Sequence, residues 1–180
     1  MPIHLGRSRS REGWLSFETD DRLTGTKRRL HERCLPCLTG LYEQLKAGVR
    51  QVELREAWTC WKVTAVVDDD EECLEVLRLF GERFPEEPVR GKLGGGVGRE
   101  TSAVIFHTES EERRDELAAL LGEVLSAHFP SRTVFVSRGC GNPYEQLLGP
   151  WQEWRPVSPI RWPDEVRGVV AALRDSLYRR

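Results

Sequence analysis

The sequence predicts an α+β fold, because segments with strand-like and helix-like patterns alternate in an order that suits one antiparallel sheet. Between residues 51 and 140 the order is strand, helix, strand, strand, helix, strand. A capping residue stands before each of these helices and a proline stands after it. A glycine-rich run, residues 91–98, joins the two middle strands. We therefore expect a ferredoxin-like split βαβ core, in which four antiparallel strands carry both helices on one face.

The first half of this core runs from residue 52 to residue 93. Residues 52–67 are rich in β-branched and aromatic side chains and predict a strand. The acidic residues 68–70 follow, and they supply an N-cap and a favourable negative charge for the first turn of a helix. Its apolar residues recur at helical spacing up to Pro85: Cys73, Val76, Leu77, Phe80 and Phe84. Residues 89–93 then predict a short strand that leads into the glycines.

The second half of the core begins after the glycines. Residues 102–107 contain an almost continuous apolar run, which is typical of a central strand. Thr108 and Glu111 have the spacing of a capping box, so a helix is predicted to start there. Apolar residues recur along this helix until Pro130: Leu117, Leu120, Leu121, Val124, Leu125 and Phe129. Residues 132–137 predict the last strand.

Extensions flank the core on both sides, and we expect all of residues 1–180 to form a single domain. Residues 1–50 are predicted to be an N-terminal helical extension, with residues 1–20 as a loosely docked lead-in. Pro36 lies inside the helical pattern and predicts two shorter helices or a kink near Cys34. Residues 141–180 are predicted to form an arm rich in tryptophan and proline, followed by a final helix that ends at Tyr178.

The predicted sheet has one face that the two core helices leave open. An apolar face of this kind needs a cover. The terminal extensions are the favoured cover, because each has one apolar stripe. A second copy of the chain is the alternative, and it would make the protein a homo-oligomer.

The composition narrows the class of protein. With 39% hydrophobic and 31% charged residues, the chain is expected to be globular and well solvated. A formal net charge of −2 argues against a main task of coating nucleic acid, whose affinity comes largely from neutralised phosphates. No apolar run approaches the roughly 18 residues of a membrane helix, and the N-terminus lacks the apolar core of a secretory signal. We expect a cytoplasmic protein without a membrane partner.

The glycine-rich hairpin is the first candidate site. Glycine amides can approach an anion closely, and neighbouring cations add charge. The candidate ligand-binding residues are Lys92, Gly94, Gly95, Gly96, Gly98 and Arg99. The run departs from a phosphate-binding P-loop, because Leu93 follows Lys92 where serine or threonine is needed and because the run leads into a strand. A mobile hairpin tip and a partner-docking loop are the alternatives.

The second candidate site is the pair Cys34 and Cys37. Two cysteines separated by two residues can hold a metal ion or form a redox pair. A closed zinc site needs four ligands, and His31 and Cys140 complete the set only if the fold brings them near. No strand precedes the pair, which weakens a thioredoxin-like interpretation. Cysteines buried as small apolar side chains are the alternative.

Two further segments contain residues that could carry out chemistry or bind a ligand. Cys140 follows the last strand between two glycines, and His107 ends a neighbouring strand, so the two are a candidate nucleophile and base, with a tight turn as the alternative. The tryptophan arm with Arg155 and Arg161 is interpreted either as a packed strap or as a surface that stacks single-stranded bases. Arg138 is a candidate ion-pair partner of the acidic residues 68–72.

The leading functional expectation is a non-catalytic binding or regulatory module that recognises a small anionic ligand, phosphate-bearing or nucleotide-like, at the glycine-rich hairpin. The alternative is a metal-binding or thiol-redox protein that uses Cys34, Cys37 and Cys140. A third hypothesis is contact with RNA through the basic N-terminal segment. The sequence specifies no cofactor and no catalytic residue, and it leaves open whether the protein is an enzyme.

Overall fold

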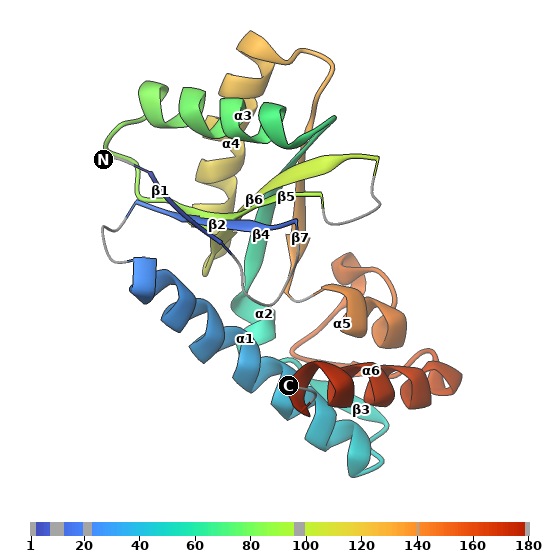
Figure 1. Ribbon diagram of the computed structural model, residues 1–180. Coiled ribbons are helices and arrows are strands. Elements are labelled where there is room, and N and C mark those ends of the chain that lie inside the picture. The colour runs from blue at the N-terminus through green and yellow to red at the C-terminus, as the bar shows by residue number, and fades with distance from the viewer. Residues whose placement is uncertain (1–2, 8–12, 20–22, 96–99, 140, 179–180) are drawn as a thin grey trace. The chain divides into compact units, whose positions relative to one another are not determined.

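The computed structural model describes residues 3–7, 13–19, 23–95, 100–139 and 141–178 (Figure 1). For residues 7, 23–34 and 141 it describes the backbone alone. The chain divides into two compact units. The first unit comprises Met1–Lys27 and Trp61–Ser137, and the second comprises Arg28–Cys60 and Arg138–Arg180. The single domain expected from the sequence, with terminal segments over the open face of the sheet, stays a prediction.

The first unit contains an antiparallel sheet of six strands in the order β1-β2-β5-β6-β4-β7. The strands are β1 (His4–Arg7), β2 (Leu15–Glu18), β4 (Trp61–Val67), β5 (Arg90–Gly94), β6 (Ser102–Thr108) and β7 (Val134–Arg138). Helices α3 (Asp70–Arg83) and α4 (Glu111–His128) lie together on one side of this sheet (Figure 1). The structure therefore confirms a mixed α+β fold with an antiparallel sheet.

One apolar core joins the sheet to both helices. Along β4 and β6 every second residue is buried, as expected for strands with one face on a core. The ring of Phe106 lies at the centre of this core, with ring centroids 5.2 Å from Phe17 and 4.9 Å from Phe80. Buried side chains of both helices belong to the same cluster: Cys73, Val76, Leu77, Phe80, Leu117, Leu121, Val124 and Leu125.

Both core helices begin at side-chain caps. The carboxylate of Asp69 accepts a hydrogen bond of 2.8 Å from the backbone N–H of Glu72, which confirms the predicted acidic cap of α3. The capping box predicted at Thr108 is wrong, because the N-cap of α4 is Ser110, whose hydroxyl accepts from the Arg113 N–H at 3.1 Å. Strand β6 continues through Thr108 in register with Trp61, so the helix starts later than predicted.

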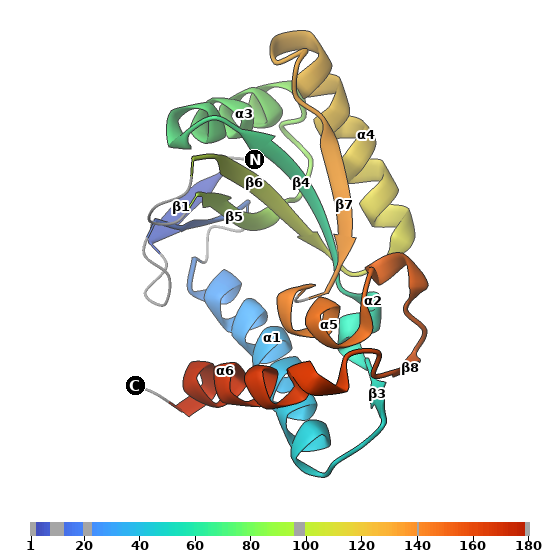
Figure 2. The same ribbon diagram turned by 90° about the vertical axis from the view of Figure 1, so that its right-hand side faces the viewer.

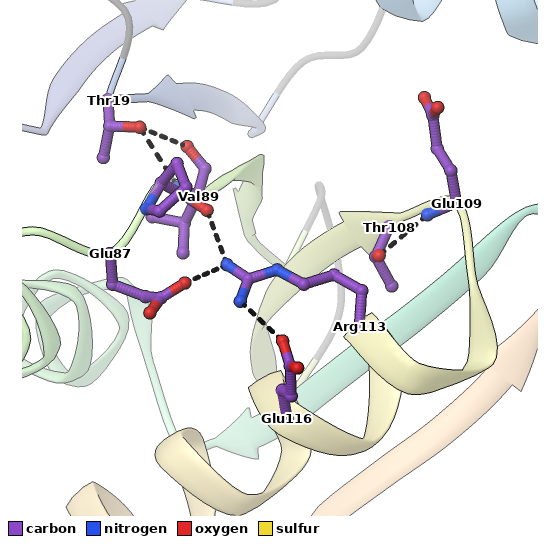
Figure 3. A network of polar contacts seen from close by, with 8 residues as sticks. Thr19, Glu87, Val89, Thr108, Glu109, Arg113 and Glu116 are labelled. Atoms are coloured by element: carbon purple, nitrogen blue, oxygen red, sulfur yellow. Dashed lines mark hydrogen bonds and ion pairs between the residues drawn. The ribbon is translucent and has the colours of Figure 1, made fainter.

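A polar network ties α4 to the segment before β5 (Figure 3). Arg113 pairs with Glu87 and also donates to the backbone oxygen of Pro88 at 2.9 Å. On the same segment, the Val89 N–H donates to the Thr19 hydroxyl at 3.1 Å, and the Thr19 N–H donates to the Val89 oxygen at 3.0 Å. The network fixes the entry of β5 between the end of β2 and the first turns of α4.

The N-terminal segment differs from the loosely docked lead-in that the sequence predicts. Strand β2 pairs antiparallel with β5, and β1 pairs with β2, so the sheet gains two strands at that edge. Phe17 is fully buried in the core beside Phe106. Burial of this ring explains the docking, because an aromatic side chain contributes one of the largest apolar areas a single residue can bury.

The second unit is built on helix α1 (Leu23–Lys46), most of which belongs to this unit. Helix α1 is continuous with Pro36 inside it, so the predicted division into two shorter helices is wrong, and the alternative kink near Cys34 stays a prediction. Proline removes one backbone donor, and packing of the following turns offsets that loss. Side chains of these turns are buried: Cys37, Leu41, Tyr42 and Leu45.

The other elements of the second unit are β3 (Gln51–Glu53), α2 (Glu56–Thr59), α5 (Gly141–Leu148), the 3-10 turn η1 (Trp151–Glu153), β8 (Val157–Pro159), the 3-10 turn η2 (Pro163–Glu165) and α6 (Val166–Tyr178). Strand β3 pairs antiparallel with β8, and the two lie side by side in Figure 2. The final helix predicted to end at Tyr178 is confirmed. Within the described ranges, every helix is too short or too polar to cross a membrane.

The strand region predicted over residues 52–67 is confirmed at residues 61–67, but it is not one continuous strand. The chain forms β3, turns at Arg55 with a φ of +47°, continues as α2 and only then enters β4. The amide of Gln44 closes the free edge of β3, because its Nε2 donates to the Glu53 oxygen at 3.1 Å and its oxygen accepts from the Glu53 N–H at 2.8 Å. This side chain imitates a neighbouring strand and ends the small sheet of the second unit.

Candidate functional site

The glycine-rich hairpin lies between β5 and β6 in the first unit. Lys92 is on β5, where it pairs with Ser16 of β2 and with Ile105 of β6. Its ammonium nitrogen lies 4.5 Å from the centroid of the Trp14 ring. A neutral ring attracts the cation without neutralising its charge, so Trp14 orients Lys92. The candidate residues Gly96, Gly98 and Arg99 lie outside the described residues.

Neighbouring atoms lie so close to Gly91, Gly94 and Gly95 that a larger residue would not fit at these positions. A Cβ added to Gly91 would lie 1.9 Å from the backbone oxygen of Ile105 and 2.6 Å from the Phe17 ring. Gly94 has a φ of +126°, and its Cβ would lie 2.1 Å from the oxygen of Gly13. At Gly95 the nearest atom, the Thr101 oxygen, would be 2.6 Å away. Packing within the sheet therefore requires glycine at these three positions.

Cys73 of α3 lies under the start of the hairpin. Its side chain is fully buried, and it is a free cysteine. Burial raises the pKa of the Cys73 thiol from 9.0 to about 12, although a hydrogen bond to the Gly94 backbone opposes the shift. The thiol therefore stays protonated at neutral pH, where it acts as a small apolar core group and is a poor nucleophile.

Stability above pH 9 is expected to depend on Cys73. The folded state keeps this proton up to about pH 12, whereas the unfolded chain releases it near 9.0, so the folded state binds more protons between these values. Stability should therefore fall with rising pH by up to about 1.4 kcal/mol per pH unit in this window. Urea unfolding at a series of pH values measures the slope, and Cys73→Ala should flatten it. An equal slope in the variant would contradict the assignment.

Of the cysteine pair, the structure describes the side chain of Cys37 but not that of Cys34. Cys37 is 7% exposed and packs in the core of the second unit, and its backbone oxygen accepts a hydrogen bond of 3.4 Å from the Tyr144 hydroxyl. The side chains of His31, Cys34 and Cys140 lie outside the described residues. Among the side chains that are described, no group of three or more His, Cys, Asp or Glu residues is placed to hold a metal ion. The metal and thiol hypotheses for these residues stay predictions, as does the pairing of Cys140 with His107.

Arg138 stacks on a tryptophan. The guanidinium carbon of this buried residue lies 3.7 Å from the centroid of the Trp58 ring, and Nη1 donates to the Trp58 backbone oxygen. Arg132 pairs with the acidic block, because it contacts Asp68 and Glu72, and the predicted pairing of Arg138 with that block stays a prediction. The ring of Trp58 accounts for the position of Arg138, because a guanidinium prefers the face of an aromatic ring when both are removed from water.

The tryptophan arm contributes to a packed interior. Trp154 is 4% exposed, and its indole N–H donates to the Gly149 oxygen at 2.8 Å. A side chain held in this way cannot stack on a base. Trp162 is 52% exposed. Trp154 belongs to the core of the second unit, and a strap that packs across the open sheet or a partner surface stays a prediction.

A cavity of about 700 Å³ lies in the second unit beside this arm, and sequence reasoning did not find it as a site. Arg155 and Arg161 line it. The sequence singled out both arginines, as partners of neighbouring tryptophans. The pairing of β3 with β8, which completes the cavity wall, joins segments far apart in the chain and leaves no local signal.

Comparisons of this chain with protein-family models, with curated proteins and with solved structures found no match.

Proposed function

We propose that the protein is a non-catalytic binding module for a small anionic ligand, phosphate-bearing or nucleotide-like, at the glycine-rich hairpin. The observation that carries the proposal is the position of Lys92, whose ammonium group lies 4.5 Å from the centroid of the Trp14 ring on the strand that enters the hairpin. A cation held beside a glycine-rich turn suits an anion, because it adds charge to backbone amides.

The proposal assigns different tasks to the residues of the run. Gly91 and Gly94 allow the neighbouring backbones to approach, and the Gly94 backbone contacts the Cys73 thiol. The charge for the ligand would come from Lys92 and Arg99. Glycines beyond Gly95 would supply the amides.

We further infer that the four strands β5-β6-β4-β7 with α3 and α4 are a ferredoxin-like split βαβ unit, widened by β1 and β2. The strand order and the common core of the two helices support this inference. A fold of this type hosts many functions, so the function rests on the hairpin and not on the topology. A cytoplasmic location is part of the proposal, and a buried reduced thiol such as Cys73 suits it.

Isothermal titration against inorganic phosphate, pyrophosphate and a panel of nucleotides tests the proposed site. We expect at least one of these anions to bind and Lys92→Gln to weaken that binding by about 10- to 150-fold, since a hydrogen bond to a charged group contributes about 1.5–3 kcal/mol. Lys46→Gln is the matched control, because the Lys46 ammonium also lies over an aromatic ring, 5.3 Å from the centroid of Tyr42. Silence across the panel, or an equal effect of the two substitutions, would overturn the proposal.

A further inference from the structure

The cavity of the second unit is a half-open hollow with a volume of about 700 Å³. Pockets that bind small molecules commonly have volumes of roughly 300–1,000 Å³ and combine apolar walls with a few polar groups. The cavity of the second unit likewise has both apolar and polar lining residues. Its lining residues are Gln51 of β3, Leu148 of α5, residues 152–155, residues 157–159 of β8, and Arg161.

The backbone around Arg155 is fixed before any ligand arrives. The Ser158 hydroxyl accepts a hydrogen bond of 2.8 Å from the Arg155 N–H and donates one of 2.9 Å to the Arg155 oxygen. The side chain of Ser158 is itself buried. The next residue, Pro156, accepts a hydrogen bond of 2.9 Å from the Leu54 N–H. Arg155 therefore projects from a closed turn, which lowers the entropy cost of binding at this point.

The second arginine of the cavity is also held in place. The Arg161 N–H donates to the Leu147 oxygen at 2.8 Å, and its guanidinium pairs with Glu153. Gly149 has a φ of +80°, and a Cβ there would lie 3.4 Å from the Cδ and the Nη1 of Arg161. This is an ordinary contact distance, so the positive φ and not the arginine favours glycine there.

The charges of the lining residues do not cancel. Two arginines and one carboxylate, that of Glu153, line the cavity, and Glu153 forms an ion pair with Arg161. Among the residues that the structure describes, no side chain forms a hydrogen bond or an ion pair with the guanidinium of Arg155. The amides of Gln51 and Gln152 add uncharged donors to the same wall. Leu148 and Trp154 provide apolar surface.

From this arrangement we propose a second binding site, in the second unit, for a small anion whose carboxylate or phosphate group is held by Arg155. The guanidinium offers two parallel N–H donors, which match the two oxygens of a carboxylate or phosphate. Gln51 and Gln152 bind further polar atoms of the ligand. The site shares no residue with the glycine-rich hairpin, so either proposal can fail while the other holds.

A titration of uniformly ¹⁵N-labelled protein, followed by two-dimensional NMR, tests this site with two probes, citrate and inorganic pyrophosphate. We expect chemical-shift changes at the side-chain amides of Gln51 and Gln152 and at the backbone amides of Arg155, Val157 and Ser158. Arg155→Gln should weaken binding of the probe by about 10- to 150-fold, as for the loss of a charged hydrogen-bond donor. The substitution should leave the fold intact, because the exposed Arg155 side chain has no partner in the described structure.

Arg174→Gln is the matched control. Arg174 lies on α6 of the same unit, is exposed, pairs with Asp175 and does not line the cavity, so binding should be unchanged. Citrate and pyrophosphate compare the carboxylate and phosphate forms of the ligand, and binding of either one supports the site. The proposal is overturned if neither probe at millimolar concentration shifts these signals, or if Arg155→Gln and Arg174→Gln weaken binding equally. Lys92→Gln should leave these signals unaffected.

Discussion

Replacing Gly91 with alanine is expected to lower the free energy of unfolding by about 3 kcal/mol, because the sheet has no room for a methyl group there. The added Cβ would lie 1.9 Å from the backbone oxygen of Ile105, and a backbone atom cannot move aside as a flexible side chain can. It would also lie 2.6 Å from the Phe17 ring, which is fully buried. Strand β5 would have to move away from β6 or from the core. Urea unfolding, followed by far-ultraviolet circular dichroism, measures the loss.

Gly122→Ala is the control for this substitution. Gly122 lies inside α4 of the same unit, and its added Cβ would lie 3.9 Å from a methyl carbon of Val134, an ordinary contact distance. Alanine is the better helix former, so we expect a gain of up to about 1 kcal/mol. If both alanine variants changed stability by the same amount, the close approach at Gly91 would not be the cause.

The glycine run shows where sequence reasoning stops. A run of glycines predicts a flexible turn when only neighbouring residues are considered. The sequence does not show which atoms of distant residues lie near each glycine in the folded protein. Gly91 is fixed by Ile105 and Phe17, and Gly94 by Gly13, all of which are brought near by strand pairing. The same run therefore contains glycines required by packing, and the sequence alone could not separate these from glycines available to a ligand.

The elements that were predicted correctly have strong local signals. Asp69 as the cap of α3 follows from the preference of an N-cap for a short acceptor side chain. The apolar spacing of both core helices matches their buried residues. Strands β1 and β2 were missed because each has four residues, too few to show a period, and because their stability comes from pairing with β5. The break in residues 52–67 depends on Arg55, whose positive φ has no local signature.

The cavity of the second unit could not be predicted for the same physical reason. Its residues come from β3 and from the segment after α5, which meet only when β3 pairs with β8. The sequence did mark Arg155 and Arg161, but as companions of tryptophans. Arg161 forms an ion pair with Glu153, and the Ser158 hydroxyl fixes the turn at Arg155. Both contacts depend on the folded structure. Residue type alone did not show that Arg161 is paired with Glu153 or that both arginines line one cavity.

Phe106→Ala is expected to cost about 3–5 kcal/mol, the range for removing a buried aromatic ring. The side chain is fully buried, and its ring contacts those of Phe17 and Phe80. These three rings come from β6, β2 and α3, so the cavity left behind would loosen three elements at once. Because small proteins are commonly stable by about 5–15 kcal/mol, the variant should be close to unfolding at ordinary temperature.

Two further variants keep this prediction testable if the alanine variant does not fold. Phe106→Leu retains most of the buried volume and should cost only about 1.5 kcal/mol. Phe135→Ala makes the same chemical change on β7, where the ring is 55% exposed, and should change stability by less than about 1 kcal/mol. At neutral pH the urea midpoint should thus be highest for Phe135→Ala, lower for Phe106→Leu and lowest for Phe106→Ala. A midpoint for Phe135→Ala below that of Phe106→Leu would show that the stability of the sheet depends on its other face, and the arrangement of the core around Phe106 would need revision.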